Sequence, residues 1–476
     1  MKFGMTIGGF LLGGSAIAAG HFLSQPSATA MPKGDDGSGG AAAAGPDVIV
    51  GGVPDVSKWG ASGGIAAYSF GSTSCNIGSV QLDWVASSNQ HPVIPQNAYR
   101  LKNGRFEQIG MSFVKHGFCA LQQSLCGPCT PAGPGCPQLL GIGCSDPYDS
   151  NLNGSTGGLG PRSQVNAATG FFPYPFAAPA DPSTPSVLKR RVQIANTELD
   201  PALNAGATYY AECQYVHPDD AAAGNDDNNA SYRKFTVGSF SSGAYNIALT
   251  GATTQQQAAI FAWKAVDAAV TIVNVDVPND GRFHVGYRVT DNGNGTWHYE
   301  YAVFNLNSDR SGGSFSIPIP DGVNVTNIGF HDISYHSGEL YSTTDWAGAV
   351  ASGSLSWATE AFAANSNANA LRWATLYNYR FDADAAPTNA SGSLGLFKPP
   401  AGADPVAVSF ATLAPTAPPP PPVCPADLNA DGNVDAADLA LLLGGWGGTD
   451  TGNLDGTGTV DAADLAILLG AWGPCP

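Results

Sequence analysis

Residues 282–303 read RFHVGYRVTDNGNGTWHYEYAV, a stretch in which two alternating runs flank a segment of Asn and Gly. Apolar side chains take every second position on both sides of that segment: Phe283, Val285, Tyr287 and Val289 before it, and Trp297, Tyr299, Tyr301 and Val303 after it. Period two on both sides of an Asn-Gly turn predicts a β-hairpin with one apolar face. We therefore expect a chain that is mainly β.

Shorter runs of the same style occur at 270–277, 314–319, 323–328 and 371–381, and the best helical candidate is 255–269. The 60 glycines and 35 prolines indicate many turns and loops. Together these features predict a β-sandwich-like body of one or two lobes.

The charge balance narrows the classes of partner. Lys and Arg number 20 against 38 Asp and Glu, which gives a net charge of -18. Nucleic acid is disfavoured as a partner, because binding phosphate requires a basic surface. The acidic excess is compatible with binding cations.

The N-terminus has the features of an export signal. Lys2 precedes an apolar run from Phe3 to Ala19, and small residues at 16–18 and 28–30 offer cleavage sites. We expect a signal peptide at 1–30 and a flexible leader at 31–47. No other stretch approaches the roughly 20 apolar residues of a membrane span. The expectation is a secreted, extracellular chain, with no span once the signal is cleaved.

Composition also divides the rest of the chain. We place a β-rich body at 48–411, a Pro-rich linker at 412–423 and a C-terminal region at 424–476, called the tail. Seven of the nine cysteines lie in the body, so one is left over there. Cys424 and Cys475 bracket the tail and would clasp its two ends. Cys126-Gly-Pro-Cys129 matches the spacing of a redox-active cysteine pair. The Pro- and Gly-rich residues after it cannot form the helix that such a pair needs, so we favour a disulfide-knotted loop. A zinc site formed by His116 and nearby cysteines is the weaker alternative.

The first part of the tail has the spacing of an EF-hand calcium loop. Calcium takes oxygen ligands from positions 1, 3, 5, 7, 9 and 12 of twelve, with Gly at position 6 for a sharp turn. Gly432 takes position 6, and the predicted ligands are Asp427, Asn429, Asp431, Asn433 (through its carbonyl), Asp435 and Asp438. Four carboxylates at one point would repel one another without a cation.

The pattern recurs at an offset of 26 residues, from Asp427 to Asn453. The predicted ligands of the second loop are Asn453, Asp455, Thr457, Thr459, Asp461 and Asp464. It has fewer carboxylates, so we expect weaker calcium binding. Val434 and Val460 take position 8, and we expect them to pair with each other.

Each loop leads into a helix with an apolar stripe at offsets 0, 3, 4 and 7. The stripes are Leu439, Leu442, Leu443 and Trp446, and Leu465, Leu468, Leu469 and Trp472. Neither stripe can be buried alone, so the two repeats are expected to form one small core.

With its duplicated loop, its Trp-Gly pairs after each helix and its closing Gly-Pro-Cys, the tail resembles a dockerin. The resemblance is closest to the compact form with Gly-Trp-Gly found on exported bacterial proteins. It implies a small all-α domain that holds Ca²⁺ and docks onto a cohesin-like partner, at the cell surface or in an assembly that degrades polysaccharide. Where cellulosomal dockerins carry Ser-Thr and a basic residue, this tail has Ala436-Ala437, Ala462-Ala463 and no Lys or Arg. A sorting or anchoring role is equally open.

Two groups in the body are candidates for chemistry. His331, Asp332, His336, Glu339 and Asp345 form its densest polar cluster, which we interpret as a polar loop rather than a metal or acid/base site. Glu300 shares a strand face with His298, and Asp332 would be its partner if the body hydrolysed glycosides.

Tryptophans at 297, 346 and 373 are candidates for stacking on sugars, although core packing is more common. We favour a non-catalytic binding or structural module displayed through the tail. The alternative is a polysaccharide-degrading glycoside hydrolase.

Overall fold

The computed structural model describes residues 45–177, 179–418, 424–449 and 451–475. The chain divides into two compact units. The first comprises the residues up to Ile319 together with Val323–Thr416, and the second comprises Pro320–Gly322 and Ala417–Pro476. The first contains the body and the second contains the tail. The predicted signal peptide, and the leader up to residue 44, lie outside the described residues.

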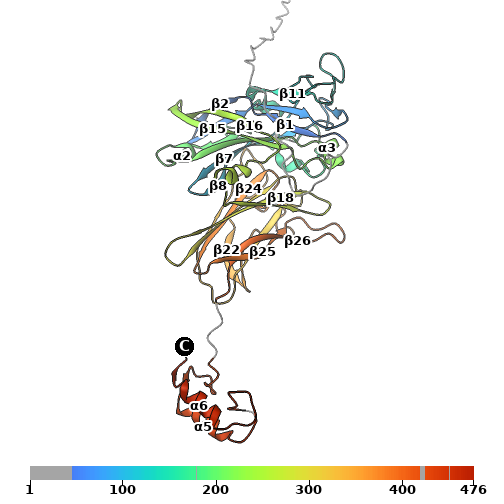
Figure 1. Ribbon diagram of the computed structural model, residues 1–476. Coiled ribbons are helices and arrows are strands. Elements are labelled where there is room, and N and C mark those ends of the chain that lie inside the picture. The colour runs from blue at the N-terminus through green and yellow to red at the C-terminus, as the bar shows by residue number, and fades with distance from the viewer. Residues whose placement is uncertain (1–44, 178, 419–423, 450, 476) are drawn as a thin grey trace, which may run out of the picture. The chain divides into compact units, whose positions relative to one another are not determined.

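The N-terminal lobe of the body is built on an eight-stranded antiparallel sheet with strand order β16-β15-β14-β7-β8-β13-β3-β2 (Figure 1). Its strands are β2 (Val56–Ser62), β3 (Ile65–Phe70), β7 (Gln96–Lys102), β8 (Arg105–Met111), β13 (Val192–Ala195), β14 (Thr208–Gln214), β15 (Ala230–Ser241) and β16 (Ala244–Thr254). Aromatic side chains of one face, such as Tyr68, Tyr209 and Phe235, form a core with Val50 and Trp84 from neighbouring segments.

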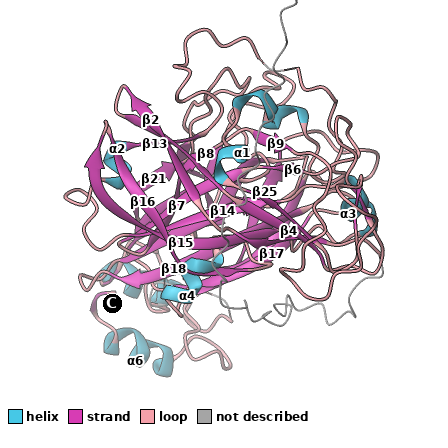
Figure 2. Ribbon diagram, turned by 90° about the horizontal axis from the view of Figure 1, so that it is seen from above, coloured by secondary structure: helices cyan, strands magenta, loops and turns pink. Residues whose placement is uncertain are grey.

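Short elements surround this sheet. The strands are β1 (Val48–Gly52), β4 (Ser72–Asn76), β5 (Leu82–Asp83), β6 (Val93–Ile94), β9 (Val114–His116), β10 (Leu139–Leu140), β11 (Ser145–Tyr148) and β12 (Leu159–Gly160). The helices are α1 (Ser150–Asn153), α2 (Asn196–Leu199) and α3 (Pro218–Ala223), with 3-10 turns at Thr156–Gly158 and Arg162–Gln164. Figure 2 shows how strands dominate the body.

The C-terminal lobe consists of two five-stranded antiparallel sheets. One has the order β17-β18-β19-β24-β21, from β17 (Thr271–Asp276), β18 (Arg282–Asp291), β19 (Trp297–Asn305), β24 (Thr375–Ala383) and β21 (Val325–His331). The other has the order β22-β23-β20-β25-β26, from β22 (Ala347–Ala351), β23 (Ser354–Ala358), β20 (Gly312–Pro318), β25 (Pro387–Leu396) and β26 (Ala407–Pro415). Their facing side chains share one core, in which the rings of Phe315 and Tyr379 lie 4.3 Å apart. The sandwich predicted from the alternating runs is thus present as one lobe of two.

Strand β19 shows how the lobes join. Tyr299, Tyr301 and Val303 point into the sandwich core, while Ala302 and Phe304 point the other way. Those two pack against a second core that includes Tyr99 and Phe106 of the N-terminal lobe. Strand β19 is therefore buried on both faces, and its alternating side chains pack into two different cores.

The predicted hairpin is confirmed, with Val289 opposite Tyr299 and Asp291 opposite Trp297. The predicted helix at 255–269 is wrong in extent, because α4 covers only Phe261–Val266. Gln256 has a φ of 58°, which is incompatible with a continuous helix, and the N–H of Ala259 donates to the Glu212 side chain at 2.6 Å.

The tail contains two helices of equal length, α5 (Ala436–Gly444) and α6 (Ala462–Gly470). Two short strands, β27 (Asn433–Val434) and β28 (Gly473–Pro474), pair antiparallel. Within the described part of the chain, no helix combines the length and apolar character that crossing a membrane requires.

Candidate functional site

The first tail loop is held together by its own predicted ligands. Asp427 accepts the N–H groups of Asp431 at 3.1 Å and Gly432 at 2.8 Å. Asn429 accepts the N–H of Asp431, and Asp431 accepts that of Asn433, both at 3.0 Å. Such turns direct the side-chain oxygens of positions 1, 3 and 5 towards the inside of the bend, where Gly432 has a φ of 87°.

The acids at positions 9 and 12 cap the helices. Asp435 is the N-cap of α5, and its side chain forms a reciprocal capping box with Asp438. Asp461 and Asp464 do the same for α6. Capping accounts for this pair of acids in each loop, but not for the oxygens at positions 1, 3 and 5.

The position-12 aspartates have matching surroundings in the two repeats. Asp438 accepts N–H groups from positions 2, 3 and 9 of its loop at 2.7, 3.1 and 2.9 Å. Asp464 accepts the equivalent three at 2.6, 3.0 and 2.9 Å. Both side chains are buried. These N–H groups lower the pKa of each carboxyl, the N–H of Asp435 contributing most for Asp438 and that of Asp455 most for Asp464. Both carboxylates are therefore kept ionised inside the tail.

The second loop contains a buried polar atom that lacks a partner. The side-chain oxygen of Asn453, at position 1, is buried and accepts no hydrogen bond. A cation at the centre of the loop would supply that partner. The donor set of side-chain and backbone oxygens is also the chemistry that Ca²⁺ prefers.

The carboxylates themselves are not gathered as the sequence suggested. Among the described residues, no three or more Asp, Glu, His or Cys side chains converge as metal ligands would. In the first loop, the oxygens of Asp427 and Asp431 face backbone N–H groups instead. Calcium coordination at these twelve positions therefore stays a prediction.

The expected pairing of Val434 with Val460 is not observed. Val434 pairs with Gly473 after the second helix, and Val460 exchanges hydrogen bonds with Gly447 and Gly448 after the first, at 2.9 and 2.7 Å. Each loop is thus paired with the Trp-Gly segment that follows the helix of the other repeat. This crossed pairing gives a structural reason for the repeated Trp-Gly motif.

The prediction of one small core is correct for half of each stripe. Leu442 and Leu468 are fully buried with Val434 and Val460, and Leu439 and Leu465 pack against them. The other half is wrong: Leu443, Trp446, Leu469 and Trp472 are exposed. The helices end at Gly444 and Gly470, so the two tryptophans lie outside them, and Leu443 and Leu469 are in the last turn, outside the small core. Cys424 and Cys475 form the expected clasp.

In the body, Glu300 forms ion pairs with Arg105 and His298. It is 3% exposed, and both of its oxygens accept the Nε–H of Arg105, at 2.9 and 3.0 Å. His298 lies between Glu300 at 3.1 Å and Asp382 at 2.6 Å, and these carboxylates, Glu300 first, raise the pKa of the imidazole. This arrangement joins β8 to β19 and β24. It could not be found from the sequence, because Arg105 is 195 positions from Glu300.

The polar cluster around His331 is divided among separate contacts. Asp332 accepts a hydrogen bond from Asn369, and Glu339 accepts the N–H of Arg162 at 3.0 Å. The Nε2–H of His336 donates to the carbonyl of Met111 at 2.8 Å, its Nδ1 lies 3.0 Å from the hydroxyl of Ser337, and burial lowers the pKa of the imidazole to about 4. Among the described residues, no hydrogen bond joins Glu300, Asp332 and His336. The interpretation as a polar loop fits these contacts.

The candidate tryptophans are mainly core residues. Trp346 is buried in the sandwich, and Trp373 donates its indole N–H to the carbonyl of Arg162 at 3.2 Å. Trp297 is partly buried against the same sandwich core as Trp346. These contacts match the core-packing interpretation.

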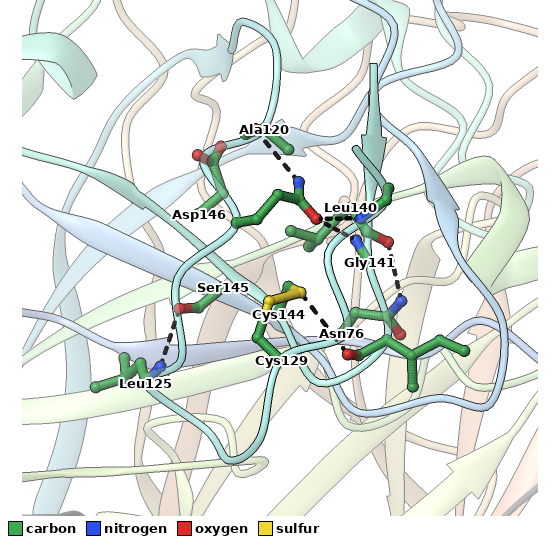
Figure 3. Close-up of a disulfide and its surroundings, with 12 residues drawn as sticks. Asn76, Ala120, Leu125, Cys129, Leu140, Gly141, Cys144, Ser145 and Asp146 are labelled. Carbon is green, nitrogen blue, oxygen red and sulfur yellow. Dashed lines mark hydrogen bonds between the residues drawn. A yellow bond between two sulfur atoms is a disulfide. The ribbon is translucent and has the colours of Figure 1, made fainter. Parts of the chain in front are cut away.

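The cysteines confirm a disulfide-knotted loop. Cys126 pairs with Cys75, Cys129 with Cys144, and Cys119 with Cys136, so the two cysteines of Cys-Gly-Pro-Cys are not bonded to each other. Figure 3 shows Cys129–Cys144 beside Asn76, which donates to the Leu140 carbonyl at 3.2 Å. Cys213 is the buried cysteine left over. The zinc alternative fails, because these sulfurs are bonded and His116 contacts the carbonyls of Gly117 and Ser88.

No known family model matches the chain, and a search of curated proteins finds no match either.

Proposed function

We propose that this is an exported protein whose dockerin-like tail binds calcium and docks the β-rich body onto an extracellular or cell-surface partner. The observation that carries the proposal is the repetition of one loop geometry around Asp438 and Asp464. Two loops 26 residues apart preserve the same three hydrogen bonds to a buried, ionised carboxylate. Helix capping accounts for these bonds, but not for the side-chain oxygens that recur at positions 1, 3 and 5 of both loops, where calcium takes its ligands.

Further support comes from the environment of the loops. The tail has eight Asp and no Lys or Arg, so no basic side chain of its own can neutralise the loop acids. The unsatisfied oxygen of Asn453 and the positive φ of Gly432 and Gly458 suit a bend closed around a cation. The Cys424–Cys475 bond is what a module this small needs, and disulfides are typical of exported proteins.

The body is proposed to be a binding or structural module. The contacts of Glu300 and Asp332 are those of structural side chains, so they give the glycoside hydrolase alternative no support.

Isothermal titration of the full chain with CaCl₂ tests the proposal. We expect saturable binding, with the first loop tighter than the second. Asp431→Ala removes a charged ligand and should weaken the tighter site about tenfold or more, roughly 1.4 kcal/mol. Thr457→Ala removes a neutral oxygen from the weaker loop and should have a smaller effect. No heat at millimolar calcium would reject the proposal.

A further inference from the structure

The two tail repeats expose the same large apolar side chains to the same extent. Leu441 and Ile467 are both 41% exposed, Leu443 and Leu469 both 52%, and Trp446 and Trp472 both 49%. The buried core uses the other apolar residues of the helices, such as Leu442 and Leu468. These six side chains, called the paired apolar faces, lie outside that core.

Their geometry suits contact with another surface. Leu443 and Leu469 lie in the last turns of α5 and α6, and Trp446 and Trp472 follow two residues after each helix ends. The N–H of Trp446 donates to the carbonyl of Leu443 at 3.3 Å, which keeps these two residues in one turn. Leu441 and Trp446 also border a shallow hollow with Gly444, Gly445 and Gly448. A tryptophan beside a hollow is typical of the centre of a protein interface.

The negative charge of the tail limits which partners can bind to the paired apolar faces. All ionisable side chains of the tail are aspartates: Asp427, Asp431, Asp435, Asp438, Asp450, Asp455, Asp461 and Asp464. A second copy of the tail, or a surface of anionic lipid, would be repelled. A surface that is apolar at its centre and carries Lys or Arg at its rim is complementary in both respects.

We infer that the paired apolar faces are the docking surface of the tail, and that its partner is a protein presenting an apolar patch rimmed by basic residues. This inference rests on the proposed docking function and adds the residues and the partner chemistry. The Ala residues at 436–437 and 462–463 are not needed for this contact.

The test uses the full chain in calcium and three synthetic helical peptides as probes. One peptide is built from Leu and Lys, the second from Leu and Glu, and the third from Lys and Ser. Fluorescence anisotropy should show saturable binding of the Leu–Lys peptide at least tenfold tighter than of either other peptide. Equal binding of the Leu–Glu or the Lys–Ser peptide would overturn the inference.

Variants identify the surface. A fourfold variant should bind the Leu–Lys peptide at least tenfold more weakly; it combines Leu443→Ser, Trp446→Ser, Leu469→Ser and Trp472→Ser. A second variant, Ala440→Lys with Ala466→Lys, should weaken binding of the same peptide by charge repulsion alone. As matched controls, Leu203→Ser and Val406→Ser remove exposed apolar side chains from the body, which are 56% and 68% exposed, and should change nothing. Undiminished binding by the fourfold variant would contradict the assignment.

Two further measurements separate this inference from the proposed function. Calcium titration of the fourfold variant should give the wild-type isotherm, because no calcium-loop residue is changed. A normal isotherm with undiminished peptide binding rejects only the docking surface, whereas no calcium binding in either protein rejects the proposed function. Sedimentation of the full chain in calcium should show a monomer. A dimer abolished by the fourfold variant would identify a second copy as the occupant and overturn the inference.

Discussion

Several acidic side chains of the body are paired with a base, whereas the tail has no Lys or Arg that could pair with its aspartates. Glu300 is bonded by Arg105, Glu107 by Arg100 and Asp309 by Lys398. In the tail, the loop aspartates accept hydrogen bonds from backbone N–H groups and from the neutral side chains of Asn429 and Thr457, and the region has no Lys or Arg. A carboxylate paired with a base is neutralised within the fold, whereas the unpaired carboxylates repeated in the tail are where we propose that a cation binds.

The largest effect is expected from removing the clasp of the tail. Cys424→Ser with Cys475→Ser opens a link between residues 51 positions apart. The loop-closure entropy corresponds to about 4 kcal/mol of tail stability. Pulse proteolysis with mass spectrometry should show cleavage in 424–475 at lower urea than in the wild type. Body peptides should be released at the wild-type urea concentration, and an unchanged tail would contradict the prediction.

A somewhat smaller loss is expected in the body when a base is removed. Arg105→Met leaves the buried Glu300 without its principal partner and should cost about 3 kcal/mol in the free energy of unfolding. Urea denaturation measures this cost, and adding Glu300→Gln should recover part of it.

Lys398→Met provides the matched control, because it removes a base from a more exposed pair. Its cost should stay below about 1 kcal/mol. Equal costs for Arg105→Met and Lys398→Met would show that Glu300 does not depend on Arg105.

The smallest effects are expected from pH, with opposite signs in the two regions. The pKa of His298 is raised in the folded body, so its stabilisation is complete below the unfolded pKa and lost as pH rises through the folded pKa. The pKa values of Asp438 and Asp464 are lowered, so their stabilisation is present above the unfolded pKa and lost as pH falls through the folded pKa. Thermal unfolding monitored separately for body and tail peptides should show these opposite slopes. His298→Gln should flatten the slope of the body only.

Features that depend on interactions between residues close in the sequence could be predicted, whereas features that depend on distant residues could not. The β18–β19 hairpin and the helices α5 and α6 that follow the two loops depend on neighbouring residues, and their patterns could be recognised in the sequence. The capping role of the acids at positions 9 and 12 was missed, because the same spacing had been assigned to calcium ligands. The Arg105–Glu300 pair and the crossed pairing of Val434 with Gly473 join distant segments, so no local pattern could show them. The apolar stripes gave the helices but overstated their burial, because periodicity specifies a face and not the size of the core that covers it.

The most direct test is hydrogen exchange of the full chain, measured by mass spectrometry in EGTA and again in millimolar CaCl₂. We expect calcium to slow exchange in α5 and α6 and in the loops before them, while peptides from β18, β19 and β24 exchange alike in both buffers. Equal protection of the tail with and without calcium would contradict the claim that its acids are held together by an ion.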